Sequence, residues 1–415
     1  MNGIAPENLR AAATAESTMV HADLLSNEIA GFGARHALYV ASPIYRRQAY
    51  GPQHPLAIAR TETVADICYA FDWLPPSAMR QGIAASMTTL RKFHSADYIA
   101  ALRDSDINRR VERDVRKRYS IGTMENPLFA GVFERAATTV GGSILASELA
   151  LEGRIAFHPA GGTHHGRPDR ASGFCYFNDP VFALLTLLDA DLKRVLYVDF
   201  DAHHGDGVEA ALLHDSRVYM ISVHEVERWP YTGNVRSGES SRICNVPVPG
   251  DCTDSEFCYL MEQIVLPFAV AAKPQAIVIT CGADALAGDP LSTMALSNIT
   301  LWQAVEDISA LADAVVVLGG GGYNPWTVAR CWSGLWARLA EFEIPVEIPK
   351  VVRGLLSGLE CDLIDQEDIK NEWLNSIEDR VCEGPVRADV LSLVARVAPA
   401  NAPHSHYLWR SEVGP

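Results

Sequence analysis

The sequence lacks the patterns that mark disulfide-rich, zinc-finger and membrane proteins. Its nine cysteines are scattered and none forms a CxxC pair, which favours reduced thiols over a disulfide framework or a zinc finger. The chain shows no basic segment followed by an apolar one near its start, and no run of about 18 apolar residues elsewhere. We therefore expect no secretion signal, no membrane span and, by default, a cytoplasmic protein.

Positive charge is also scarce. The chain has 35 Lys and Arg against 51 Asp and Glu, which gives a formal net charge of -16. Such a balance argues against nucleic acid as the main partner, because few cations are available to replace the counterions of a phosphate backbone. It favours a small molecule or a cationic substrate. Apolar residues make up 48%, enough for a large core, and a homo-oligomer remains open.

Short apolar runs recur through the middle of the chain and predict buried strands. They span residues 36–42, 154–158, 194–200, 217–224, 276–280 and 314–320. Helical patterns lie between several of them, as at 133–153 and 179–193. Continuously apolar strands that alternate with helices are typical of a mostly parallel sheet with helices on both faces, so the expected fold class is α/β.

No internal repeat or low-complexity tract divides the chain. Its length allows two or three domains, but a single large α/β domain also reaches this size. Residues 1–35 have the pattern of a helical arm. Residues 36–340 form the expected main domain, and 341–415, which begin with the proline-containing EFEIPVEIPK, form an extension that packs on the same domain.

Polar, glycine-rich segments follow four of the predicted strands. They are HPAGGTHHG, DFDAHHGDG, CGADALAGDP and GGGGYNPW. Ligands bind outside the carboxyl ends of the strands in parallel sheets, so these four segments should converge on one edge of the sheet.

The segment after the third run offers metal ligands. Asp201 and His203 are two residues apart, a spacing that points both side chains to the same side if the strand direction persists. Asp284 occupies the corresponding place after another strand. Two Asp and one His form an open site that suits Zn²⁺, and Fe²⁺ or Co²⁺ also fit such ligands. Each residue taken alone is more simply a helix or turn cap.

Two adjacent histidines, His164 and His165, lie in the glycine-rich loop after the second run. Beside a metal site they are candidates for acid and base catalysis, and each then needs an acceptor on its other ring nitrogen. Asp199 and Asp206 are the carboxylates left over for that purpose. The alternative is a pair of exposed loop histidines.

Tyr323 ends the GGGGY segment. No Lys and Ser/Thr follow the glycines as in a phosphate-binding loop. The tyrosine hydroxyl can instead stabilise an oxyanion, although a core tyrosine beside a turn is the simpler interpretation. Gly173, Phe174 and Trp229 could form the walls of a narrow slot or belong to an ordinary aromatic core. Cys175 is a less attractive nucleophile, because a metal site activates water.

The motifs together resemble the histone deacetylase superfamily, which includes bacterial acetoin-utilisation deacetylases and acetylpolyamine amidohydrolases. The resemblance covers about residues 36 to 335. It rests on YGPQHPLAIAR, FHSADYIAAL, GGTHHGRPDRASGFCYFND, YVDFDAHHGDGVE, GADALAGDPL and GGGGYNPWTVARCW, in the family's order. The class-I-like bacterial branch is the most similar.

The resemblance implies a fold, a mechanism and a role for single residues. The fold is the arginase-deacetylase fold, with residues 36–340 as the deacetylase catalytic domain. Asp201, His203 and Asp284 match zinc ligands. His165 matches the general base and His164 its electrostatic partner, with Asp206 and Asp199 as the carboxylates that orient them. Tyr323 matches the tyrosine that binds the scissile carbonyl.

It also implies binding sites around this centre. Gly173, Phe174, Trp229 and Leu291 match the walls of an acyl-lysine tunnel, and Arg60 matches the arginine of an internal acetate channel. A structural potassium ion is matched by Asp199, Asp201, His203, Ser222 and Val223. Class-I enzymes have a rim aspartate that this chain lacks, and Glu125 is the nearest acidic candidate.

The function expected from this resemblance is removal of acetyl groups from acetyl-lysine in peptides or proteins, or from a related acylated primary amine. An acetylpolyamine or small-metabolite amidohydrolase is the main alternative. A two-manganese arginase-like hydrolase is disfavoured, because one extra residue separates His203 from Asp206 and further ligands are missing. A catalytically silent binder of acylated ligands ranks lowest, since no part of the apparatus is absent.

Overall fold

The computed structural model describes residues 37–47, 49–235 and 242–397. The predicted helical arm at 1–35 lies outside the described residues. Within them the chain forms an eight-stranded sheet in the order β2-β1-β3-β8-β7-β4-β5-β6, and every neighbouring pair is parallel. The strands are β1 (Ala37–Ala41), β2 (Met79–Gln81), β3 (Ile155–His158), β4 (Val195–Asp199), β5 (Val218–Glu225), β6 (Ile243–Val248), β7 (Ala276–Thr280) and β8 (Ala314–Leu318).

The six predicted strands are confirmed, and the two edge strands were missed. β2 has only three residues and is largely exposed, so it carries no apolar run. β6 reads ICNVPV and contains Pro247, which lacks a backbone N–H and is tolerated at a sheet edge. Both strands form because a long neighbour, β1 or β5, offers unpaired backbone groups.

Successive residues of the central strands pack into different cores. In β4, Val195 and Tyr197 join one hydrophobic cluster, whereas Leu196 and Val198 join the other. This alternation follows from the two-residue period of a strand. Both faces are apolar because helices cover both, which explains why the sequence shows continuous rather than alternating hydrophobicity.

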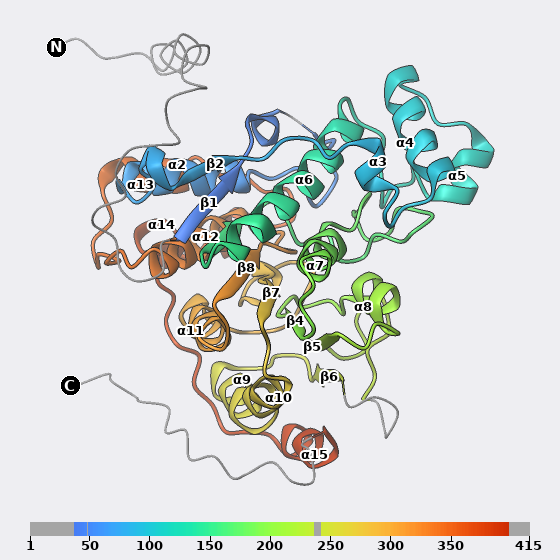
Figure 1. Cartoon of the computed structure of the whole chain (residues 1–415). Coiled ribbons are helices and arrows are strands. Elements are labelled where there is room, and N and C mark those ends of the chain that lie inside the picture. The colour runs from blue at the N-terminus through green and yellow to red at the C-terminus, as the bar shows by residue number, and fades with distance from the viewer. Residues whose placement is uncertain (1–36, 48, 236–241, 398–415) are drawn as a thin grey trace, which may run out of the picture. The chain divides into compact units, whose positions relative to one another are not determined.

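The helices lie in two layers around the sheet (Figure 1). One face is covered by α6 (Val132–Leu151), α7 (Asp179–Asp189) and α8 (Asp206–Leu212). The other is covered by α2 (Thr61–Ala70), α9 (Asp254–Leu260), α10 (Leu266–Ala272), α11 (Asn298–Ser309), α12 (Pro325–Leu339), α13 (Lys350–Ser357), α14 (Asn371–Asn375) and α15 (Ala388–Val397). Short α3 (Met87–Leu90), α4 (Ala96–Asn108) and α5 (Arg113–Tyr119) lie together at one end of the molecule.

A π-helical turn, Met261–Val265, joins α9 and α10 into one stretch, Asp254–Ala272. By length and composition this stretch could cross a membrane. It contains no continuous apolar run of that length, because polar residues such as Glu256, Glu262 and Gln263 interrupt it. It is 44% buried, and Phe257, Met261 and Ile264 belong to the core on the sheet. Its apolar side is thus used in packing.

The residues after the main domain pack on the same body. The buried guanidinium of Arg330 in α12 donates to the main-chain oxygens of Ser376 (2.6 Å) and Glu378 (2.9 Å). It also forms an ion pair with Asp379 at 2.6 Å. Trp373 stacks on Trp326 with ring centroids 6.1 Å apart. These contacts attach residues 373–379 to α12, and the bounds of the extension, 341–415, stay a prediction.

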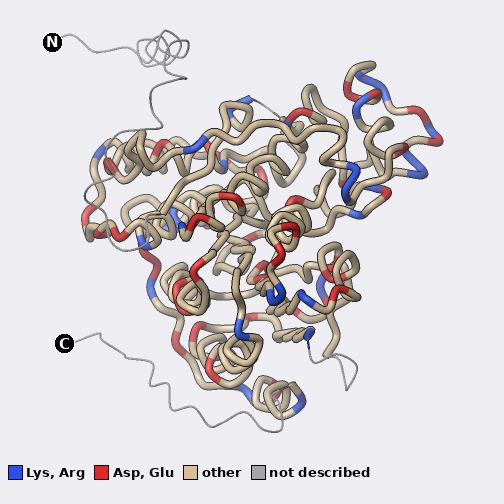
Figure 2. Tube along the Cα trace, in the orientation of Figure 1, with Lys and Arg blue, Asp and Glu red and all other residues tan. Residues whose placement is uncertain are grey.

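The segment at 108–119, NRRVERDVRKRY, is rich in arginine, and most of its residues are exposed. Figure 2 shows Lys and Arg interspersed with Asp and Glu on α4 and α5. Several of its arginines have acidic neighbours, as in the pairs Arg109 with Asp106 and Arg110 with Glu112. The interspersed signs favour the interpretation of a charged, water-facing helix surface over a dedicated anion site.

Candidate active site

The strand ends lie level at the carboxyl edge of the sheet. His158 of β3 pairs with Leu318 of β8, Leu318 with Thr280 of β7, and Thr280 with Asp199 of β4. Each strand continues into one of the four polar segments. The parallel register therefore brings together residues that are up to about 160 positions apart, as the position of ligand sites in α/β sheets leads one to expect.

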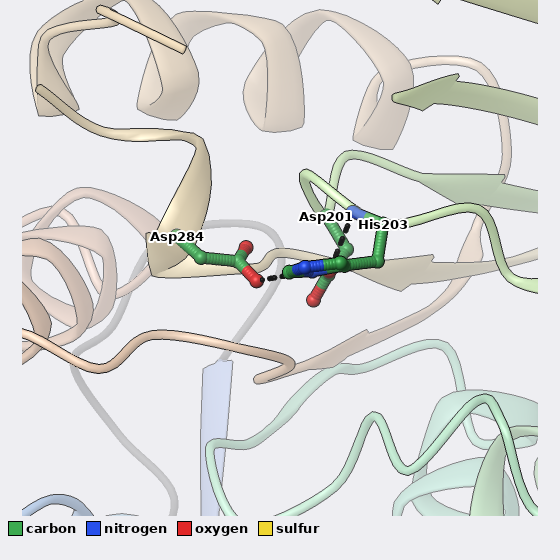
Figure 3. Close-up of side chains that lie close together, drawn as sticks. All are labelled: Asp201, His203 and Asp284. Atoms are coloured by element: carbon green, nitrogen blue, oxygen red, sulfur yellow. Dashed lines mark hydrogen bonds and ion pairs between the residues drawn. The ribbon is translucent and has the colours of Figure 1, made fainter. Parts of the chain in front are cut away.

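Asp201, His203 and Asp284 form a buried cluster at this edge (Figure 3). The first two lie in the loop after β4, and Asp284 lies in the short 3₁₀ helix Ala283–Ala285 after β7. The His203 Nδ1 atom is 2.9 Å from Asp284 Oδ2 and 3.2 Å from Asp201 Oδ1. One ligand atom from each residue lies within 4.8 Å of the other two.

Backbone N–H groups hold the two carboxylates in this orientation. Gly321 donates to Asp201 Oδ2 over 2.6 Å, and Ala202 donates to Asp284 Oδ1 over 3.1 Å. The other oxygen of each carboxylate then faces His203. A Cβ atom at Gly321 would overlap the Asp284 carboxylate. This close approach explains one of the glycines before Tyr323.

The donor set fits a divalent cation. Ligand atoms at about 2.0–2.1 Å from a tetrahedral ion lie about 3.3 Å apart, near the 3.2 Å between His203 and Asp201. Burial disfavours a charged His203, yet hydrogen bonds to Asp201 and Asp284 outweigh burial and raise its pKa to about 10. The two carboxylates thus create a buried environment that favours positive charge.

The two adjacent histidines each bind a different carboxylate. His164 Nδ1 is 2.7 Å from Asp199 Oδ2, and His165 Nδ1 is 2.8 Å from Asp206 Oδ1. Ionised carboxylates only accept hydrogen bonds, so both Nδ1 atoms carry a proton. The rings lie 3.9 Å apart between centroids and are buried, which excludes the alternative of exposed loop histidines.

The environments push the two imidazoles toward different protonation states. Burial disfavours charge on His164, but Asp199 and Asp201 outweigh it and raise its pKa to about 9. For His165, burial and the positive charge of His164 lower the pKa to about 3. Its partner Asp206 is shared with the guanidinium of Arg167, which weakens the attraction for a second proton. His165 is thus neutral, with Nε2 unprotonated.

Arg167 was missed from the sequence, although it follows the histidine pair closely in HHGRP. Its head group also donates to the main-chain oxygen of Asp206 over 3.2 Å. Tyr197 was missed as well. Its hydroxyl donates to Asp199 Oδ2 over 2.7 Å. Tyr197 is two residues before Asp199 in β4, so its side chain points to the same face of the strand.

Asp289 is the third residue that sequence reasoning missed. Its Oδ2 atom accepts the main-chain N–H of Tyr323 over 2.7 Å, and its Oδ1 atom accepts that of Leu291 over 2.9 Å. The carboxylate is buried, and burial followed by the charge of Asp284 raises its pKa to about 7. It therefore links the predicted oxyanion-binding residue to a predicted tunnel wall. Asp289 lies in AGDP, within one of the four polar segments identified from the sequence, but nothing in the local sequence indicated which groups its carboxylate binds.

A pocket of about 480 Å³ opens onto the cluster. All five predicted substrate-binding residues line it: Glu125, Gly173, Phe174, Trp229 and Leu291. His165, His203 and Tyr323 also face it.

The walls of this pocket are tied together locally. The Phe174 ring is 5.8 Å from that of Tyr323, and the Trp229 ring is 4.5 Å from that of His165. Glu125 Oε1 accepts the N–H of Gly173 over 2.8 Å, so its carboxylate braces a wall at the mouth. Cys175 is buried, and burial raises the pKa of its thiol, which agrees with its dismissal as a nucleophile.

A second cavity of about 130 Å³ is also lined by His164, His165 and Tyr323. Arg60, predicted for an internal channel, lines it. The Arg60 guanidinium donates to the main-chain oxygen of Gly320 over 2.5 Å and lies 5.0 Å from the Trp332 ring centroid. Its Nε atom is buried without a hydrogen-bond partner. A cation in that position can bind a small anion.

The residues predicted for potassium come from the end of β4, the loop that follows it and the neighbouring strand β5. Asp199 pairs with Ser222 in the register of β4 and β5, and Val223 follows. Asp199 Oδ1 accepts the N–H of Asp201 over 3.1 Å. His204, in the same loop as His203, has a structural role: its ring nitrogens bind Thr232 at 2.8 Å and Glu209 at 3.0 Å.

The fold and site together define a class: α/β proteins with an Asp-His-Asp cluster and a histidine pair at the carboxyl edge of a parallel sheet. Residues 54–339 match the family model for the histone deacetylase domain. This chain belongs to the histone deacetylase family.

The relatives are similar over most of this chain. Histone deacetylase 3 of Oryza sativa subsp. japonica is 35% identical over 309 residues, which are 72% of this chain and 60% of that protein. Histone deacetylase 1 of Homo sapiens is 34% identical over 309 residues, covering 72% of this chain and 64% of that protein. The chain therefore spans less than two thirds of the length of these relatives.

Solved structures agree with the fold over a larger part of the chain. The crystal structure of an HDAC homologue from Aquifex aeolicus has a TM-score of 0.83 and 29% identity, and covers 88% of this chain and 100% of that one. A crystal structure of an HDAC homologue complexed with SAHA gives the same values. The likeness confirms the expected arginase-deacetylase fold.

Proposed function

We propose that this protein is a metal-dependent deacetylase that hydrolyses the acetyl amide of acetyl-lysine or a related primary amine. The observation that carries the proposal is the position of His165, which bonds to Asp206 through Nδ1 and lies beside the Asp201, His203 and Asp284 cluster in the lining of one pocket. An unprotonated imidazole can accept a proton from water, and a cation-binding cluster next to it suits hydrolysis.

Three side chains of the site have a defined catalytic task in this proposal. Nε2 of His165 accepts the proton of the attacking water and passes it to the leaving amine nitrogen. His164, with its raised pKa, keeps a positive charge that helps to stabilise the developing oxyanion. The hydroxyl of Tyr323, which also faces the pocket, donates to the same oxygen.

Asp201, His203 and Asp284 would hold the ion. When bound, it polarises the acyl carbonyl and makes water more acidic. We propose Zn²⁺ as this ion, because a mixed carboxylate and imidazole set suits it, while Fe²⁺ and Co²⁺ fit the same ligands. We further propose K⁺ near Asp199 and Ser222, since a monovalent cation there would balance the fully buried Asp199 carboxylate.

The substrate we propose first is an acetylated lysine in a peptide or protein, as the relatives' names indicate, and the product carboxylate would pass toward Arg60 in the inner cavity. An acetylated polyamine is the second candidate. Its remaining amines are positively charged, and the net charge of -16 favours cationic ligands.

One panel of substrates tests the proposal. Metal content and hydrolysis are measured on the same preparation with an acetyl-lysine peptide, acetylspermidine and acetylputrescine. We expect one divalent ion per chain and turnover of the acetyl-lysine peptide. If only the acetylated polyamines are hydrolysed, an acetylated polyamine replaces acetyl-lysine as the proposed substrate. Two divalent ions per chain would support the arginase-like alternative, and tight binding of every amide without turnover would support a silent binder.

A further inference from the structure

A buried carboxylate joins two loops at the mouth of the pocket. Glu225 is the last residue of β5 and is only 6% exposed. It accepts two hydrogen bonds from the guanidinium of Arg228, at 2.6 and 2.9 Å. It accepts two more from Thr293, one from the backbone N–H at 2.9 Å and one from the hydroxyl at 2.8 Å. Each carboxylate oxygen thus accepts one hydrogen bond from Arg228 and one from Thr293.

Each of the two loops contributes a residue to the lining of the pocket. Arg228 directly precedes Trp229, and Thr293 follows Leu291 by two residues. Trp229 and Leu291 both line the pocket that leads to His165. Because Glu225 binds both loops, its carboxylate holds the Trp229 loop in a fixed position relative to the Leu291 loop.

The geometry makes this connection stiff. A bidentate Arg–carboxylate pair has a fixed planar geometry, and charged hydrogen bonds are stronger than neutral ones. The base of the link is also anchored, since the N–H of Glu225 donates to the oxygen of Ala202 over 2.9 Å. Ala202 lies between two residues of the metal-capable cluster.

We infer that Glu225 and Arg228 are positioning residues that set the width of the substrate tunnel and thereby select slender, unbranched amines. Glu225 is not among the residues that line the pocket, whereas Arg228 lines it beside Trp229. The link acts on the pocket lining and needs no contact with the reacting atoms. The inference rests on the proposed function, because the walls matter for specificity only if an acylated amine enters between them.

The chain offers a matched control at the far end of the same strand. Arg217, just before β5, makes an equivalent bidentate pair with Asp215 at 3.0 and 2.7 Å. That pair lies at the amino end of the sheet, away from the pocket. Arg217→Met and Arg228→Met therefore remove the same kind of bond at the two ends of one strand.

The test compares two peptides with the same acetyl group. One contains acetyl-lysine, and the other contains acetylated 4-(aminomethyl)phenylalanine, whose ring is wider than the lysine chain. We expect Arg228→Met and Thr293→Val to reduce the preference in kcat/KM for the slender chain by about fivefold or more, mainly through KM. Arg228→Lys should restore part of it, and Arg217→Met should leave it unchanged.

A second readout needs no activity. Acrylamide quenching of Trp229 fluorescence, isolated by subtracting a Trp229→Phe blank, should rise at least about twofold in Arg228→Met but not in Arg217→Met, because a released wall exposes the indole. If folded Arg228→Met and Thr293→Val keep the wild-type preference for the slender chain, and Arg228→Met keeps the wild-type quenching of Trp229, the inference is wrong. Inactivity of the wild-type protein toward all amides would instead overturn the proposed function. The quenching of Trp229 would still show whether the bonds between Arg228 and Glu225 hold the Trp229 loop in place.

Discussion

The main-chain N–H of Tyr323 donates to the carboxylate of Asp289 over 2.7 Å. The other oxygen of this carboxylate accepts the N–H of Leu291, so one side chain fixes two functional segments. Such a residue supports the tyrosine without contacting substrate.

Asp289→Asn should therefore lower kcat by about tenfold or more, because its amide NH₂ faces one of the two N–H donors and leaves it unpaired. Asp254→Asn is the control. Asp254 is also buried and accepts the N–H groups of Ser297 (2.8 Å) and Cys382 (2.6 Å), and none of these three residues lines the pocket. Both variants should lose similar stability in urea unfolding. Equal loss of kcat in both would refute a specific role for Asp289.

Tyr323→Phe should retain substrate binding and lose turnover. Removal of one donor to a developing oxyanion lowers kcat by about 100-fold to 1,000-fold in other enzymes. We expect KM to change little and the metal content to stay at the wild-type level. Full turnover in a metal-loaded Tyr323→Phe preparation would remove this residue from the mechanism.

His165 should respond both to its own removal and to the loss of Arg167, which shares Asp206 with it. His165→Ala removes the unprotonated imidazole, so kcat should fall by at least about 100-fold. Arg167→Met removes a cation from Asp206 and leaves the whole carboxylate to His165. The pKa of His165 should then rise, and the acidic limb of the kcat/KM profile against pH should move to higher pH. An unchanged profile would mean that Arg167 does not tune this group.

Metal removal should be visible in thermal stability. An ion that binds only the folded protein stabilises it by about 2.7 kcal/mol at a concentration 100 times its Kd. Chelation should lower the Tm of the wild type, and added Zn²⁺ should restore it. In Asp284→Asn neither treatment should shift the Tm, whereas the exposed control Asp365→Asn should behave like the wild type. A zinc-dependent shift of normal size in Asp284→Asn would place the ion elsewhere.

The buried His94 predicts a loss of stability in mild acid. Its Nδ1 lies 2.9 Å from the Arg167 oxygen, and its Nε2 accepts the N–H of Asn178 over 3.1 Å. Burial lowers its pKa to about 4. The unfolded chain takes up this proton near its ordinary pKa of about 6.5, so stability falls between about pH 6.5 and 4, by about 1.4 kcal/mol per pH unit.

His94→Gln separates this effect from other acid effects. The Gln side chain can donate to the same oxygen and accept from the same N–H, but it does not titrate in this range. Urea unfolding of both proteins at pH 7.5 and pH 5 should show a smaller loss for the variant, by about 2 kcal/mol. Equal losses would mean that folding does not lower the pKa of His94.

The sequence by itself determined the strands and the chemical content of the site. Apolar β-branched runs formed six central strands because helices cover both faces of the sheet. Parallel strands end at the same edge, so Asp201, His203 and Asp284 had to meet once these strands were neighbours. The order of the motifs sufficed to indicate the family.

Only the tertiary structure decided which groups pair across long sequence distances. Arg167 and Asp206 are 39 residues apart, and Asp289 and Tyr323 are 34 apart. No local pattern couples such positions, because the contacts arise from the loops that the sheet places side by side. The contrasting charge states of His164 and His165 likewise depend on burial and on neighbouring charges. Those are properties of the folded surroundings rather than of the two identical letters in the sequence.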